Sequence, residues 1–188
     1  RAGSPVLNNL TFTLRPGECW AVVGPTGSGK TTFLQLLAGQ IPLRPGLVRR
    51  ERPAQFVSFR EDSRLFSYTG HFYQQRYQAT MSDEGTHGHA APTLHNFLQA
   101  PDSPDTNALL RRLGLLPLLD RTFLKLSNGQ TRKARIGKAL LQQPPVLLLD
   151  NPFVGLDAAF RADLTNWLAD LIRHGPTLVL ATDTEHIP

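Results

Sequence analysis

One stretch decides the fold of this chain: Gly24-Pro25-Thr26-Gly27-Ser28-Gly29-Lys30-Thr31-Thr32. It matches the pattern G-x-x-x-x-G-K-[ST] at every required position. An apolar, β-prone run precedes it over residues 19–23, and residues 31–38 follow with leucine and phenylalanine at helical spacing. A strand, a glycine-rich loop and a helix in this order form a phosphate-binding loop, so the sequence predicts a nucleotide site.

Each residue type in this loop has a physical role. Glycines allow the backbone to take positive φ and to approach a ligand closely, so that N–H groups and the positive end of the helix point at phosphate oxygens. We expect Lys30 to bridge the β- and γ-phosphates and Thr31 to place its hydroxyl on Mg²⁺. The whole loop, residues 24–32, is the predicted nucleotide-binding set.

Length and composition suit one globular domain. The chain has 188 residues, 40% of them hydrophobic and 19% charged, and a domain of this size buries roughly 70% of its unfolded surface. It contains no long apolar run, and its N-terminus shows no basic region followed by an apolar one. We therefore expect neither a membrane span nor a signal peptide. The expected location is cytoplasmic, with a partner that could hold the protein at the inner membrane.

Charge and cysteine content bear on partners and compartment. The net charge of +5 and the arginine clusters at residues 44–52 and 132–135 raise the question of nucleic acid. The clusters lack interleaved aromatic residues, and a protein that binds a polyanionic nucleotide can itself be basic, so a nucleic-acid partner is disfavoured. The single cysteine, Cys19, lies in an apolar run, which predicts a buried thiol in a reducing compartment.

Strand and helix signals alternate along the chain. Residues 1–18 alternate apolar and polar side chains, which predicts an N-terminal antiparallel β portion before the loop. Further strands are expected over 55–59, 146–149 and 177–181, and further helices over 130–141 and 160–172. This alternation predicts an α/β fold with a mostly parallel sheet core.

Residues 61–108 differ in composition from their surroundings. They are rich in Ser, Asp, Gly, His and Pro, and their helical signals are short, at 72–77, 94–98 and 106–113. We predict a small helical insertion subdomain over about residues 61–141, with loops of its own. The chain as a whole, 1–188, is then a single nucleotide-binding domain.

Two further sites are expected from side chains at the ends of elements. Asp150 ends the apolar run 146–149, and ligands of open α/β sheets bind at the carboxyl ends of strands, so Asp150 is placed to hold Mg²⁺ together with Thr31. Ser127 can cap the next helix. With the backbone N–H groups of Gly129 and Gln130 it forms a second anion site.

Three stretches after the phosphate loop resemble motifs of one family. Leu126-Ser127-Asn128-Gly129-Gln130 resembles the signature motif of the ATP-binding cassette (ABC) family, residues 147–150 resemble its Walker B strand, and residues 154–157 its D-loop. The resemblance covers nearly the whole chain and implies a P-loop NTPase that takes ATP and Mg²⁺. Residues 126–133 and 72–77 are also similar to the soluble tandem-cassette ATPases of the molybdenum-transport-like kind.

The resemblance also implies a partner. In that family the signature motif closes over the γ-phosphate held by another cassette, so that two domains sandwich two ATP molecules head to tail. We therefore expect a second copy or a second cassette, with a membrane permease as a further candidate. The family pattern extends beyond both ends of the sequence, which leads us to expect a trimmed cassette or one half of a tandem protein.

Two positions depart from the family pattern where hydrolysis takes place. The glutamate that polarises the attacking water is replaced by Asn151, and an amide cannot accept that proton. The switch histidine is replaced by Asp183, whose carboxylate would repel a γ-phosphate unless it is protonated or turned away. The candidate catalytic positions are thus Asp150, Asn151 and Asp183, and the loss of a general base lowers a rate by roughly 10²- to 10⁴-fold.

Three functions remain open from the sequence. The first is a cassette that binds ATP, hydrolyses it poorly and lends its signature motif to a partner. The second is a fully active transport ATPase in which another group supplies the base. The third is a nucleic-acid or ribosome-associated cassette.

Overall fold

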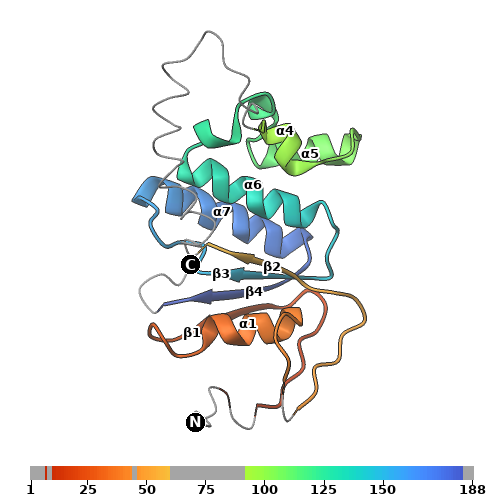
Figure 1. The fold of residues 1–188 in the computed structure, drawn as a ribbon, viewed down its shortest axis with the longest axis vertical. Coiled ribbons are helices and arrows are strands. Elements are labelled where there is room, and N and C mark those ends of the chain that lie inside the picture. The colour runs from red at the N-terminus through yellow and green to blue at the C-terminus, as the bar shows by residue number, and fades with distance from the viewer. Residues whose placement is uncertain (1–6, 8–9, 44–45, 60–91, 184–188) are drawn as a thin grey trace, which may run out of the picture.

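In the part of the chain that the structure describes, a four-stranded parallel sheet forms the centre of the fold (Figure 1). The structure is a computed structural model, and it describes residues 7, 10–43, 46–59 and 92–183. Across the sheet the strands are β1 (Cys19–Val23), β4 (Thr177–Thr182), β3 (Val146–Asp150) and β2 (Gln55–Ser58). All three strand pairs are parallel, so the predicted α/β core is confirmed.

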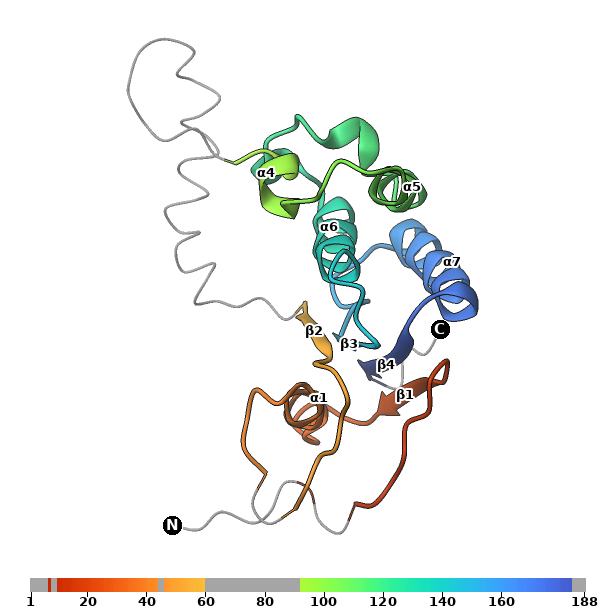
Figure 2. The same cartoon turned by 90° about the vertical axis from the view of Figure 1, so that its right-hand side faces the viewer.

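Helices cover both faces of this sheet, which explains why its two central strands are mostly apolar and buried along almost their whole length. Helix α1 (Lys30–Ala38) lies on one face, and α6 (Asn128–Leu140) and α7 (Ala158–His174) lie on the other (Figures 1 and 2). Leu148 of β3 packs in the hydrophobic cluster to which α1 contributes side chains. Leu147 and Leu149 pack in the cluster on the other face, to which α6 and α7 contribute. This alternation follows from the two-residue period of a strand.

A second apolar layer lies beyond α6. It is built from α4 (Leu94–Leu98), α5 (Pro104–Arg112) and the short 3₁₀ helices η1 (Leu116–Leu118) and η2 (Phe123–Lys125), and Figure 2 shows it stacked over α6. The helices expected over 94–98 and 106–113 correspond to α4 and α5; the one expected over 72–77 lies outside the described residues. No helix in the described ranges has the length and apolar character to span a membrane.

The parallel arrangement brings the carboxyl ends of all four strands to one edge. Val23 pairs with Thr182, Asp150 with Ala181, and Ser58 with Asp150. The segment that follows β1 is the predicted phosphate loop. Asp150, the candidate Mg²⁺ ligand, therefore ends β3, and Asp183, the candidate switch position, directly follows the end of the neighbouring strand β4 at the same edge.

The strand predicted before the loop is wrong for residues 10–18, none of which is in a strand. A strand requires a neighbour for its backbone groups, and the described part of the sheet pairs β1 with β4 alone. Phe12 instead packs its ring on Trp20 and Phe33, with centroids 5.4 and 5.5 Å apart.

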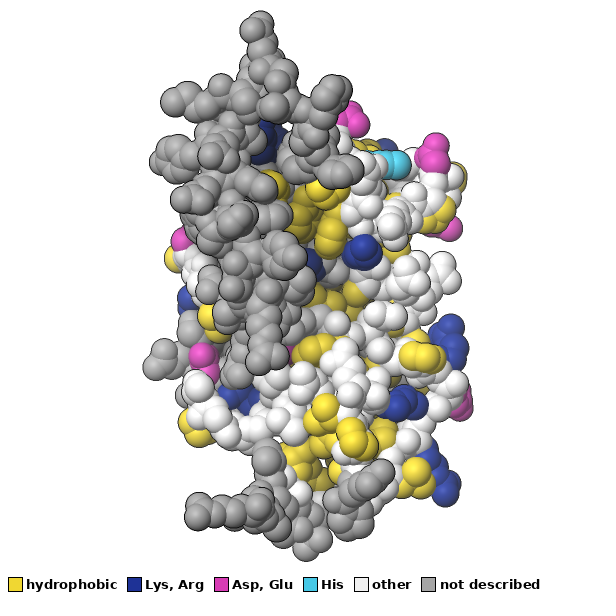
Figure 3. All heavy atoms as spheres, viewed as in Figure 1, with side chains coloured by type: hydrophobic (Ala, Val, Ile, Leu, Met, Phe, Trp, Pro, Cys, Tyr) yellow, Lys and Arg dark blue, Asp and Glu magenta, His cyan; other side chains and the backbone are white. Residues whose placement is uncertain are grey.

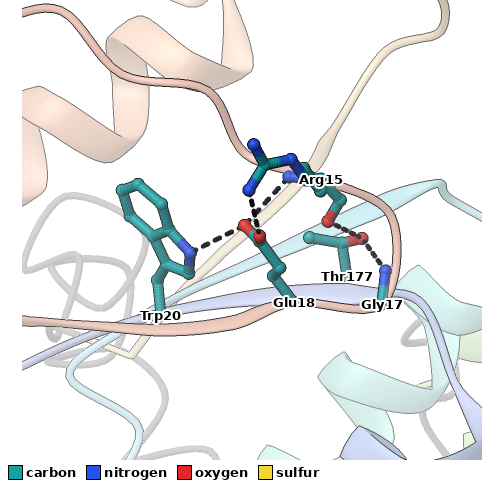
Figure 4. A network of polar contacts seen from close by, with 5 residues as sticks. All are labelled: Arg15, Gly17, Glu18, Trp20 and Thr177. Carbon is teal, nitrogen blue, oxygen red and sulfur yellow. Dashed lines mark hydrogen bonds and ion pairs between the residues drawn. The ribbon is translucent and has the colours of Figure 1, made fainter.

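A polar network holds the turn that leads into β1 (Figure 4). The carboxylate of Glu18 accepts hydrogen bonds from the Arg15 backbone and from Trp20 Nε1, both at 3.0 Å. Thr177 Oγ1 accepts from Gly17 N at 2.8 Å and donates to Arg15 O at 3.3 Å. The bond from the Arg15 backbone lowers the pKa of Glu18 below its ordinary value. The network fastens this turn to the start of β4.

The predicted burial of Cys19 is also wrong, because its side chain is exposed. Exposure alternates along β1: Cys19, Ala21 and Val23 are exposed, whereas Trp20 and Val22 pack in the cluster of α1. An apolar strand at one side of the described sheet is thus covered on one face only. The sequence pattern gave no sign of this, since every residue of the run is compatible with a core.

Candidate functional site

The predicted phosphate loop connects β1 to α1, and residues 30–32 form the first turn of that helix. Gly27 and Gly29 have φ of 86° and 90°, a left-handed conformation that residues with side chains rarely adopt. A Cβ on Gly24 would lie 2.8 Å from Ser28 Oγ. The first turn of α1 contains no acidic residue, so the free N–H groups at its start are available to an anion.

Lys30 is buried within this loop, with 6% of its surface exposed. Its Nζ donates to Gly24 O at 2.5 Å and to Pro25 O at 2.9 Å. A buried ammonium requires such partners, and it carries three donor hydrogens, so it can also serve an anion bound by the loop. The charge of Lys30 is thereby fixed on the loop that is predicted to bind phosphate.

Asp150 is fully buried at the end of β3 and joins three elements. Its Oδ2 accepts hydrogen bonds from Thr31 Oγ1 of α1 at 2.9 Å and from Ser58 Oγ of β2 at 3.4 Å. These groups offer oxygen atoms only, which is the donor type that Mg²⁺ prefers in proteins. The residues present therefore fit the predicted Mg²⁺ site, and Ser58 is a member that the sequence did not reveal.

Asn151 adopts an unusual backbone conformation directly after Asp150. Its φ is 54°, and only 5% of its surface is exposed. Its backbone N–H donates to Ala181 O at 2.8 Å, and its side-chain Nδ2 donates to Asp150 Oδ1 at 2.8 Å. Asp183 follows the end of β4, where Thr182 pairs with Val23 just before the phosphate loop. The three candidate catalytic positions therefore gather at the same edge of the sheet.

The predicted signature segment begins α6. Ser127 is the N-cap, and its Oγ accepts from Gln130 N at 3.2 Å while Gln130 Oε1 accepts from Ser127 N at 3.0 Å. This reciprocal capping box fixes the start of the helix. Because α6 and α1 lie on opposite faces of the sheet (Figure 1), the candidate second anion site and the phosphate loop belong to different layers.

Gly129, in the first turn of α6, is packed against an aromatic ring. A Cβ at this position would lie 1.9 Å from Cε1 of Phe160 in α7, a separation that is impossible for two non-bonded carbon atoms. The close approach of the two helices at this point therefore requires a residue without a side chain.

Replacing Gly129 by alanine is expected to lower the free energy of unfolding by about 1–3 kcal/mol, because the Phe160 ring must move. Alanine is the better helix former by about 1 kcal/mol, so a loss would show that the clash outweighs propensity. Urea denaturation measures the effect. In a Phe160→Leu background the same substitution should cost clearly less, and an equal cost in both backgrounds would exclude the clash as the cause.

Basic side chains that follow the signature segment form contacts with other parts of the chain. Arg132 donates to Pro152 O at 2.9 Å and to Val154 O, and its guanidinium lies 5.2 Å from the ring centroid of Phe59. Burial, and secondarily Arg135, lowers the pKa of Arg132. Lys133 forms an ion pair with Asp163. On the face shown in Figure 3, Lys and Arg side chains are scattered rather than gathered in one patch.

Comparisons with known proteins agree with the motifs. The family model for ABC transporters matches residues 7–154. The ABC transporter ATP-binding protein ModF of Escherichia coli is 38% identical over 175 residues, which cover 90% of this chain and 34% of ModF. The sulfate/thiosulfate import ATP-binding protein CysA of Mesorhizobium japonicum is 32% identical over 185 residues, which cover 95% of this chain and 52% of CysA. The chain thus spans about a third to a half of the length of these relatives.

Solved structures show the same fold. A chain of an inward-facing ABC transporter superposes with a TM-score of 0.68 at 26% identity, over 92% of this chain and 66% of that one. A nucleotide-free ATP-binding cassette from an ABC transporter superposes with a TM-score of 0.66 at 21% identity, over 94% of this chain and 74% of that one. The resemblance stated from the motifs is confirmed.

Proposed function

The chain belongs to the ABC transporter family, and from that premise we propose that it binds Mg-ATP through residues 24–32 and hydrolyses it weakly by itself. One observation supports both halves of the proposal. Thr31 and Asp150 are hydrogen-bonded at the end of the phosphate loop, while the neighbouring side chain is the amide of Asn151. The groups that would bind Mg-ATP are present, whereas the position expected to carry the proton acceptor holds the amide of Asn151.

Binding would depend on the loop and the buried charge of Lys30. The N–H groups at the start of α1 and the Lys30 ammonium would hold the β- and γ-phosphates. Thr31 and Asp150 would hold Mg²⁺, which supplies neutralisation of the phosphate charge. Because Asp150 is fully buried and hydrogen-bonded to two hydroxyls, its carboxylate is held in one orientation before nucleotide arrives.

Weak hydrolysis would follow from Asn151 and Asp183. The Asn151 amide has no basic atom, and its Nδ2 is already engaged with Asp150 Oδ1. Asp183, at the end of β4, would bring a negative charge rather than an imidazole to the edge where the γ-phosphate is expected. A water molecule at this site would then find no base at position 151.

A second cassette is the proposed partner. The exposed residues Ser127 and Asn128 at the start of α6 leave that helix end accessible to the phosphate of another domain. ModF and CysA are named as ATP-binding proteins of an ABC transporter and of an import system, which supports a membrane permease as a further partner. Through it the domain would be peripheral to the cytoplasmic side of the inner membrane.

Calorimetric titration with ATP and with AMP tests the binding half of the proposal. ATP should bind saturably in the presence of Mg²⁺, and AMP should bind at least about tenfold more weakly, since the charge-assisted hydrogen bonds to the β- and γ-phosphates are each worth about 1.5–3 kcal/mol. Equal affinities for the two nucleotides would show that the loop does not bind phosphate.

A further inference from the structure

We propose that Asn151 is a positioning residue for the Asp150 carboxylate; this inference rests on the proposed binding of Mg-ATP. The Asn151 amide donates to Asp150 Oδ1, whereas Thr31 Oγ1 donates to Asp150 Oδ2. The two oxygens of the carboxylate are thus held by different elements. By occupying Oδ1, Asn151 acts together with Thr31 and Ser58 to keep Oδ2 as the oxygen that faces α1, where Thr31 and Asp150 would hold Mg²⁺.

The backbone of Asn151 is itself firmly held, which makes its side chain suitable for this task. Its N–H donates to Ala181 O in the adjacent strand at 2.8 Å, and its carbonyl accepts from Val154 N at 3.4 Å. The residue is buried, with 5% exposure. A short side chain on a fixed backbone has few rotamers to lose, so the bond to Asp150 costs little conformational entropy.

The conformation at position 151 favours asparagine specifically. Its φ of 54° lies in the left-handed region, which asparagine tolerates better than residues with longer side chains. From that backbone the short amide reaches back to the residue before it. A carboxylate at the same place would instead put a second negative charge beside Asp150 Oδ1. Asn151 would therefore orient the Asp150 carboxylate, a role that is separate from the lack of a basic atom at position 151.

A purely structural role for Asn151, as a residue that only stabilises the turn after β3, makes a different prediction. Its removal would then weaken folding and lower the affinity for ATP equally with and without Mg²⁺. Positioning of Asp150 predicts a loss confined to the Mg²⁺-dependent part of binding. The two roles are thus separable by a binding measurement that involves no turnover.

The experiment compares the full chain with Asn151→Gly, which keeps the left-handed backbone and removes the amide. The matched control is Gln143→Gly, which removes an exposed side chain at φ of 47° in the turn before β3. ATP affinity is measured for each protein with Mg²⁺ and with EDTA. We expect Asn151→Gly to lose about tenfold or more of the Mg²⁺ enhancement, as residues that orient metal ligands typically do, and to keep its affinity in EDTA within about twofold. Gln143→Gly should match the unaltered chain.

An unchanged Mg²⁺ enhancement in Asn151→Gly, or an equal loss with and without Mg²⁺, would overturn the inference. A second measurement needs no variant: the side-chain amide NMR signals of Asn151 should shift when Mg²⁺ is added to the ATP complex, and an absence of shift also overturns it. Failure of the unaltered chain to bind ATP at all would instead reject the proposed function. The two ideas therefore fail in distinguishable ways.

Discussion

The Lys30→Ala variant is expected to bind ATP about tenfold to a hundredfold more weakly than the unaltered chain. Each charge-assisted hydrogen bond from the ammonium to phosphate is worth about 1.5–3 kcal/mol, and every 1.4 kcal/mol is tenfold in affinity. The substitution also leaves the carbonyls of Gly24 and Pro25 without the donor that now connects them. The loop therefore loses both its fixed charge and an internal support.

Lys125→Ala is the control for this prediction, because Lys125 is an exposed lysine in η2 and outside the phosphate loop. It removes the same charge from the protein without touching the site. Calorimetry of both variants with Mg-ATP separates local from overall electrostatics. Equal losses in the two variants would show that net charge, and not the loop, attracts the nucleotide.

Restoring hydrolysis is expected to require two changes together. Asn151→Glu alone should recover little turnover, because Asp183 still places a carboxylate where a γ-phosphate contact is needed, and the base and that contact act in the same step. Asp183→His alone should also recover little turnover, because position 151 still carries an amide that cannot accept a proton. In the double variant a base and a γ-phosphate contact are both present, and we expect turnover to rise by roughly 10²-fold or more.

The matched control for the double variant is Asn151→Gln with Asp183→His. Glutamine has the size of glutamate but no basic atom, so this protein should stay close to the unaltered chain. Steady-state phosphate release is the measurement. Full recovery by Asn151→Glu alone would mean that Asp183 does not limit hydrolysis, and recovery by the glutamine control would mean that no base at position 151 is needed.

Local patterns predicted the parts of the structure that local chemistry determines. The strand at residues 19–23, the glycine loop and the helix after it follow from hydrophobic spacing and from the need for positive φ at Gly27 and Gly29. Capping by Ser127 was predictable for the same reason, since the serine and the helix start are adjacent in sequence. The position of Asp150 at the end of a strand was predictable because an apolar run ends there.

Features that depend on which segments become neighbours could not be predicted. Ser58 meets Asp150 only because β2 pairs with β3, an order across the sheet that no residue pattern encodes. Whether residues 10–18 form a strand, and whether Cys19 is buried, likewise depends on which segments lie beside β1. Arg132 appeared as part of a basic cluster, and only the fold shows that its guanidinium binds the loop after β3.

We propose that this chain binds Mg-ATP but turns it over poorly at its own phosphate loop. The direct test is the rate of phosphate release by the purified chain at saturating Mg-ATP. It is measured together with ATP binding and is compared with the rate of the Lys30→Ala variant. We expect saturable binding, with a turnover that is at most slightly faster than that of Lys30→Ala. Fast, saturable turnover that disappears in Lys30→Ala would rule out the proposed weak hydrolysis and identify the protein as a working ATPase.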